Sequence, residues 1–127
     1  GLMFYLNNIP WNIKFVDSND PMLMDRTGKI TLATTDPDRL TIFLSYSIPK
    51  DLFKKVLIHE LSHCVMFSYN LIEYIHDIVY PEYWIEAEER VCNFVASYGK
   101  IIFDNAYSII GNDAYLFITY KIDEIIK

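Results

Sequence analysis

Two histidines four positions apart, with a glutamate directly after the first, are the residues of this chain best suited to chemistry. They lie in the run His59-Glu60-Leu61-Ser62-His63. In a helix, His59 and His63 lie one turn apart on the same face, so both imidazoles can reach one ion. Glu60 projects about 100° away, beside the ion, where a carboxylate can take a proton from a zinc-bound water. The spacing predicts a zinc site with His59 and His63 as ligands and Glu60 as general base.

The residues around this run predict a buried helix. Val56-Leu57-Ile58 precede it and Cys64-Val65-Met66-Phe67 follow it, so the helix is apolar on nearly every side. Without partners, each buried polar group there would cost roughly 1 to 3 kcal/mol. A metal ion gives the histidines a partner, so the context favours a zinc site over a chance occurrence of the pattern.

The run resembles the motif of the zincin metallopeptidases. Their extended motif has Val or Thr three residues before the first His and uncharged residues around it, as in Val56, Leu57, Leu61, Ser62, Cys64 and Val65. The resemblance implies a hydrolase that uses Zn²⁺ and a water activated by Glu60. Its substrate would be a peptide or protein, and the same chemistry extends to other amide bonds.

A catalytic zinc needs a third protein ligand and an open position for water. Glutamate-type zincins take this ligand from a second helix, here the segment with Glu86-Ala87-Glu88-Glu89-Arg90. At 100° per residue Glu88 falls within the apolar face, whereas Glu86 and Glu89 read as solvated surface. A glutamate in an apolar stripe is either a metal ligand or the partner of a buried charge. Glu88 is therefore the predicted third metal ligand, with Glu89 as second choice and His76 as a third candidate.

The segment from Glu88 to Val95 is similar to the glutamate helix of small zincins from bacteriophages and mobile elements, related to the ImmA/IrrE-type peptidases. A strand, an Asp-rich turn and a hairpin between Ile13 and Ser45 extend the resemblance over most of the chain. It implies a metalloprotease in the cytoplasm of a bacterium that carries the element.

The alternative is a catalytically weak or inactive zinc-binding module that interacts with another protein. Glu60 weighs against it, because a structural site requires only ligands and usually has four of them. A fourth protein ligand, such as His76, would favour this alternative.

Two helices must position the site, and a small sheet must support them. Alternating and β-branched residues predict strands at 11–17, 30–35 and 40–44, the last two joined as a hairpin. Helical patterns cover about 50–68, a short segment before Pro81, 82 to about 103, and an amphipathic segment at 112–127. The predicted fold is α+β: a single zincin-like domain over 1–127. In it an antiparallel three-stranded sheet packs on the motif helix and the glutamate helix, followed by a C-terminal helix. The strand at 40–45 is the predicted sheet edge beside the cleft.

Composition excludes some partners. The net charge is −6 and the 11 Lys and Arg residues are scattered, which argues against nucleic-acid binding. No apolar run reaches the roughly 18 residues of a membrane span, and the first residues show no basic segment followed by a signal core, so we expect a soluble protein that is not exported. Cys64 and Cys92 have no Cys-x-x-Cys spacing and are expected to be small buried hydrophobes.

Overall fold

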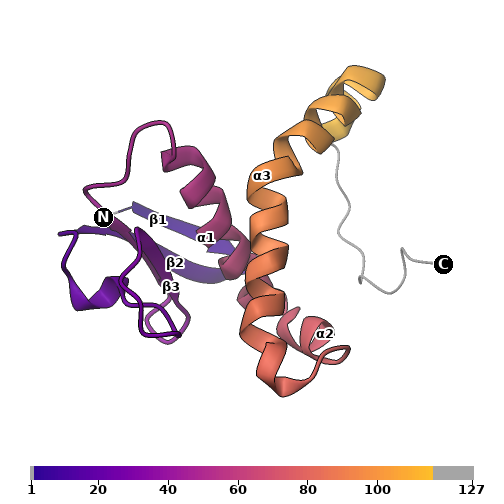
Figure 1. The fold of residues 1–127 in the computed structure, drawn as a ribbon. Coiled ribbons are helices and arrows are strands. Elements are labelled where there is room, and N and C mark those ends of the chain that lie inside the picture. Colours follow the sequence, from indigo (N-terminus) through magenta and orange to yellow (C-terminus); the bar gives the residue numbers. More distant parts are fainter. Residues whose placement is uncertain (1, 116–127) are drawn as a thin grey trace. The chain divides into compact units, whose positions relative to one another are not determined.

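The structure is a computed structural model that describes residues 2–115 of the chain. Two compact units are present, one through Ser97 and one from Tyr98 onward. The helix α3 contains residues of both units, and the prediction of a single domain stays a prediction. The elements (Figure 1) are β1 (Leu2–Leu6), β2 (Ile9–Val16), η1 (Pro21–Leu23), β3 (Ala33–Asp36), β4 (Thr41–Ser45), α1 (Phe53–Ser68), α2 (Ile72–His76), η2 (Pro81–Tyr83), α3 (Trp84–Ile110) and η3 (Gly111–Tyr115).

The sheet has four strands in the order β1-β2-β4-β3. β1 and β2 pair antiparallel, as do β3 and β4, but β2 and β4 pair in parallel. The combination of helices and a sheet agrees with the predicted class, whereas the prediction of three antiparallel strands is wrong in strand number and in one pairing. The added strand β1 joins β2 through Asn7 and Asn8, whose φ angles of 50° and 62° suit a tight hairpin turn that asparagine tolerates.

The hairpin predicted from 30–35 and 40–44 is confirmed as β3 and β4, with Asp36 opposite Thr41. The prediction that 40–45 forms the sheet edge is wrong. β4 lies between β2 and β3, and all five of its residues are buried. The reason is the parallel pairing of β4 with β2, which occupies the side of β4 that a simple meander would leave open. β3 is the edge strand at this end of the sheet.

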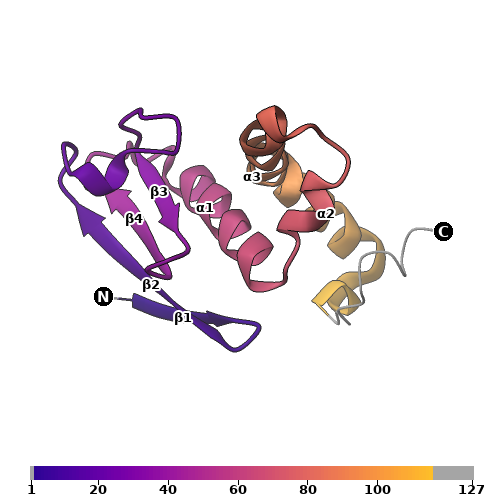
Figure 2. The same ribbon diagram turned by 90° about the horizontal axis from the view of Figure 1, so that it is seen from below.

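The core lies between the sheet and α1, which crosses one face of the sheet (Figures 1 and 2). Ile42 and Leu44 are two residues apart on β4 and point to the same face. They pack with Trp11, Ala33 and Cys64, the other buried members of this cluster. This packing fixes α1, and with it His59 and His63, against the sheet.

The motif helix was predicted at about 50–68 and is observed at Phe53–Ser68. It ends where Asn70 takes a left-handed φ of 57° and the Leu71 amide donates to the Met66 carbonyl at 2.9 Å, an arrangement that satisfies the last carbonyls of a helix. The short second helix is confirmed as α2. The glutamate helix is longer than predicted and reaches Ile110.

Three further sequence predictions concern the cysteines, a membrane span and the C-terminal segment. Cys64 and Cys92 are buried free thiols, as expected, and burial raises the pKa of each to about 12. Within the described part of the chain, no helix has both the length and the apolar character needed to cross a bilayer. Of the amphipathic segment predicted at 112–127, the residues up to Tyr115 belong to η3 and the remainder lies outside the described residues.

A buried hydrogen bond ties the sheet to the end of α1 and can be tested. The Trp11 Nε1–H donates to Ser68 Oγ at 2.8 Å, and both residues are almost fully buried. We expect Ser68→Ala to lower the free energy of unfolding by about 1 to 3 kcal/mol, because the indole N–H loses its acceptor. Urea unfolding followed by tryptophan fluorescence measures the change. Ser47→Ala, at an exposed position, is the control and should change stability by less than about 0.5 kcal/mol; an equal effect of the two substitutions would contradict this account.

Candidate metal centre

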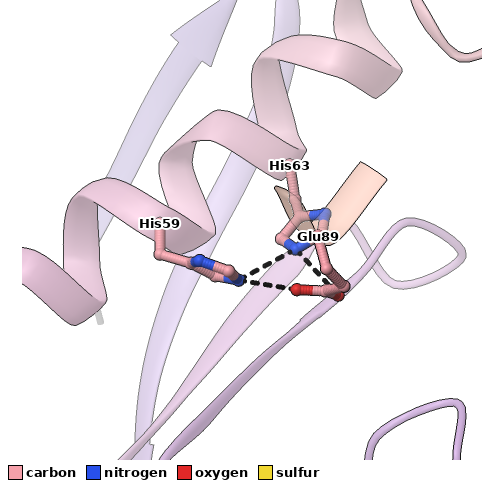
Figure 3. A group of neighbouring side chains, drawn as sticks. All are labelled: His59, His63 and Glu89. Carbon is pink, nitrogen blue, oxygen red and sulfur yellow. Dashed lines mark hydrogen bonds and ion pairs between the residues drawn. The ribbon is translucent and has the colours of Figure 1, made fainter. Parts of the chain in front are cut away.

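The two motif histidines converge on one point beside α1. His59 and His63 lie one turn apart, and their Nε2 atoms are 3.2 Å from each other (Figure 3). The rings meet edge to face, with centroids 4.9 Å apart. His63 is buried and His59 is partly buried. The helical spacing thus brings both imidazoles together, as the sequence predicts.

The third side chain at this point is Glu89 from α3. Its Oε2 lies 2.9 Å from His59 Nε2, and its Oε1 lies 3.2 Å from His63 Nε2 (Figure 3). One ligand atom from each of the three residues can be chosen so that all lie within 4.8 Å of one another. His59 on α1 and Glu89 on α3 are 30 residues apart in sequence, so the group joins two helices.

The donor set and its spacing fit a zinc ion. Tetrahedral zinc with bonds of about 2.0 to 2.1 Å places its ligand atoms roughly 3.3 Å apart, close to the 2.9 Å and 3.2 Å separations of this group. Two imidazoles and one carboxylate also match the three protein ligands of many catalytic zinc sites. Two unprotonated Nε2 atoms 3.2 Å apart would direct lone pairs at each other, and a cation between them removes that conflict.

Glu60 lies beside this group and outside it. Its Oε2 is 3.9 Å from His59 Nε2, and it is not one of the three grouped residues. Its Oε1 accepts a hydrogen bond of 2.9 Å from the Thr35 hydroxyl on the edge strand β3. The side chain is almost fully buried. The carboxylate is therefore fixed by the sheet on one side while it faces the histidines on the other.

The electrostatics of the group follow from these contacts. Burial raises the pKa of Glu60, and it outweighs the opposing effects of the two histidines and Thr35. Burial would also raise the pKa of Glu89, but hydrogen bonds with His59 and His63 outweigh it and hold that pKa well below its usual range. Burial would lower the pKa of His59, but the Glu89 hydrogen bond and the nearby Glu60 charge raise it. Glu89 is thus ionised beside the histidines, the state that a metal ligand requires.

Glu88, the predicted third ligand, belongs to a different cluster. It is buried, with only 2 % of its surface exposed, as the periodicity predicts. Its Oε1, however, accepts from Arg26 at 2.9 Å, and its Oε2 lies 2.6 Å from His76 Nε2. The structure brings Glu89, and not Glu88, together with the two histidines. Glu88 is a buried carboxylate that pairs with the half-exposed Arg26 and with His76.

His76, the third candidate for that ligand, is bonded to Glu88 in the same cluster. Its ring stacks on the indole of Trp84, with centroids 4.4 Å apart and planes 6° apart. Among the residues that the structure describes, His76 does not belong to the group that could hold a metal ion. The candidate metal ligands in the described part of the chain are therefore His59, His63 and Glu89.

Comparisons with known proteins add no further assignment. No family model, curated protein or solved structure matches this chain.

Sequence reasoning missed Arg26 and Thr35, and it ranked Glu89 second. Both are far from the motif in sequence: Arg26 contacts Glu88 and Glu89 from a turn before β3, and Thr35 contacts Glu60 from β3 itself. Glu89 had a local signal: four residues later stands Asn93, a second polar side chain, which contributes to the raised pKa of His59. Residues four apart share a helix face, so Glu89 and Asn93 form a polar stripe facing α1.

Proposed function

We propose that this protein is a zinc-dependent metallopeptidase that hydrolyses peptide bonds. The observation that carries the proposal is the position of Glu60, whose Oε2 lies 3.9 Å from His59 Nε2 beside the group of His59, His63 and Glu89. Two histidines and a carboxylate suit a metal with an open position, and a second carboxylate next to them suits a general base. The zincin-like motif supports the same reading.

Each residue has a distinct part in the proposed reaction. His59, His63 and Glu89 would hold Zn²⁺, which when bound lowers the pKa of a coordinated water and polarises the substrate carbonyl. Glu60 Oε2 takes a proton from the attacking water and passes it to the leaving amine. Thr35 keeps the other oxygen, Oε1, in a hydrogen bond, so the carboxylate does not rotate away. The raised pKa of Glu60 makes its carboxylate a stronger base than an exposed glutamate.

An extended peptide could bind along the edge strand β3. This strand is the last in the order β1-β2-β4-β3, and its Thr35 contacts Glu60 directly. Pairing of a substrate backbone with a free sheet edge is a common mode of peptide recognition. In this proposal β3 replaces the strand at 40–45 as the substrate-binding edge. The proposal extends to a phage or mobile-element protein acting in the bacterial cytoplasm, as the ImmA/IrrE resemblance implies.

The alternative of a zinc-binding interaction module is less well supported by these contacts. A structural site usually closes with four protein ligands, and His76, the side chain considered for that position, is held by Glu88. Glu60 has no role in a purely structural site. Its burial without a function would only reduce stability.

Metal removal tests the proposal. We expect the purified protein to contain about one zinc ion per chain, as in a mononuclear catalytic site. We also expect it to cleave unfolded proteins in a mixture, with the released peptides identified by mass spectrometry. Dialysis against a chelator should abolish cleavage, and one equivalent of zinc should restore it. A protein that takes up no zinc would refute the proposal, whereas one that binds zinc but cleaves no peptide in the mixture would favour the interaction module.

A further inference from the structure

We propose that Arg26 is a positioning residue that orients the Glu89 carboxylate in the metal centre. This inference rests on the proposed zinc site. The Arg26 guanidinium contacts both neighbouring glutamates of α3. Its Nη1 lies 2.9 Å from Glu88 Oε1, and its Nη2 lies 3.5 Å from Glu89 Oε1. Glu89 Oε2 remains directed at His59 Nε2, at 2.9 Å. Arg26 thus restrains Oε1, the oxygen that also lies 3.2 Å from His63 Nε2, while Oε2 faces His59.

Arg26 is well placed to act in this way because its turn is held on several sides. Asp25 Oδ1 accepts hydrogen bonds from the Thr27 amide, the Thr27 hydroxyl and the Lys29 amide, at 2.8, 2.6 and 3.0 Å. Gly28 takes a φ of +85°, which favours glycine and allows the tight turn. The turn is anchored on the sheet side through Leu23, which is fully buried and accepts from the Thr31 amide.

The other half of the arrangement is equally fixed. Glu88 is buried, and its second oxygen, Oε2, lies 2.6 Å from His76 Nε2. The His76 ring is in turn stacked on Trp84, and the Trp84 Nε1–H donates to the His76 carbonyl at 3.2 Å. Glu88 therefore serves as an anchor for the guanidinium, which then has one terminal nitrogen left for Glu89. The planar, two-pronged guanidinium suits this double contact, whereas an ammonium group is a single point charge.

Arg26 has two opposing effects on zinc binding, and their relative sizes decide whether Arg26 raises or lowers the affinity for zinc. A positive charge near the site repels the ion, but this charge is paired with Glu88, and the Arg26 side chain is 45 % exposed to solvent that screens it. The orienting effect acts on a ligand that is itself 40 % exposed and would otherwise have other rotamers available. Partners that hold a metal ligand typically change metal affinity by roughly 10- to 100-fold. Orientation therefore dominates.

The test compares zinc affinity in wild type, Arg26→Gln and Arg26→Lys by competition with a chromophoric chelator. We expect the dissociation constant to rise about 10-fold or more in Arg26→Gln, with partial recovery in Arg26→Lys. The visible absorption spectrum of the Co²⁺-substituted protein should also change in Arg26→Gln, because the carboxylate geometry changes. Arg90→Gln is the matched control, since Arg90 forms an ion pair with the exposed Glu86 on the outside of the same helix, and it should behave as wild type.

The outcomes separate this inference from the proposed function. Wild type that binds no zinc would overturn both. Wild type that binds zinc, with equal or tighter binding and an unchanged cobalt spectrum in Arg26→Gln, would overturn the role of Arg26 and leave the zinc site standing. If circular dichroism shows that Arg26→Gln does not fold, the zinc affinity and cobalt spectrum of Arg26→Lys, which keeps the charge, test the role of Arg26. A 3-fold or larger loss with an altered cobalt spectrum supports positioning, and wild-type values overturn it.

Discussion

Replacement of Glu60 by glutamine should abolish most of the hydrolytic activity and leave zinc binding intact. The amide has the size and shape of the carboxylate but cannot accept a proton from water, so kcat/KM should fall by roughly 100- to 10,000-fold. Zinc content should not change, because Glu60 lies outside the group of His59, His63 and Glu89. Steady-state cleavage of a peptide identified in the wild-type digest, with metal analysis of the same samples, measures both quantities.

The matched control for this substitution is Glu86→Gln. Glu86 is an exposed glutamate that pairs with Arg90 on the outside of α3, and its replacement removes the same charge without touching the site. We expect wild-type activity in this variant. Glu60→Gln with full activity would exclude Glu60 as the general base, and loss of zinc from Glu60→Gln would instead make Glu60 a ligand. Thermal unfolding should show no loss of stability, because a buried carboxylate with a raised pKa gains nothing from its charge in the fold.

The features predicted correctly from the sequence are those that depend on short-range spacing. The convergence of His59 and His63 follows from a four-residue separation in a helix, and it is independent of what packs around that helix. The end of α1 near Asn70 and the β3–β4 hairpin likewise depend on a few consecutive residues. Glu60 lies beside the histidine pair for the same reason, since its direction is set by the adjacent position.

The strand order could not be derived in this way. Parallel pairing of β2 with β4 joins residues such as Ile13 and Ile42, and no local preference decides between this pairing and a meander. The hairpin of β1 and β2 did have a local signal, the pair Asn7-Asn8 between two apolar runs. Because β3 and not β4 became the edge, the residue that holds Glu60 from the sheet is Thr35, which the sequence did not single out.

The choice between Glu88 and Glu89 shows a general weakness of burial arguments at a proposed metal site. Helical periodicity identifies the most buried position, and it did so correctly for Glu88 and Cys92. A ligand of a catalytic metal, however, must also border a space that substrate can enter, so the position next to the most buried one is favoured. Glu89 meets this condition better than Glu88, because 40 % of its side chain is exposed. Its deep neighbour instead pairs with Arg26, 62 residues away in the chain, which no local pattern reveals.

The decisive experiment on the ligand set is a comparison of Glu89→Gln with Glu88→Gln. We expect Glu89→Gln to weaken zinc binding by at least about 100-fold, because it removes the negative charge and a ligand atom from the centre, a larger loss than that of a supporting contact. Glu88→Gln should weaken binding by only about 10-fold, since its amide oxygen can still accept from Arg26. The two substitutions change the same group at adjacent positions of one helix, so each controls for the other.

Zinc-dependent stabilisation gives an independent measure of the same difference. Saturating zinc stabilises a protein that binds it only when folded, by an amount that grows with the ratio of free ion to dissociation constant. The rise in melting temperature on zinc addition should therefore be large in wild type, smaller in Glu88→Gln and nearly absent in Glu89→Gln. The reverse order, with the rise retained in Glu89→Gln and lost in Glu88→Gln, would show that Glu88 is the ligand. It would also mean that its contacts with Arg26 and His76 break when zinc binds, and Arg26 would then compete with the metal instead of orienting its ligand.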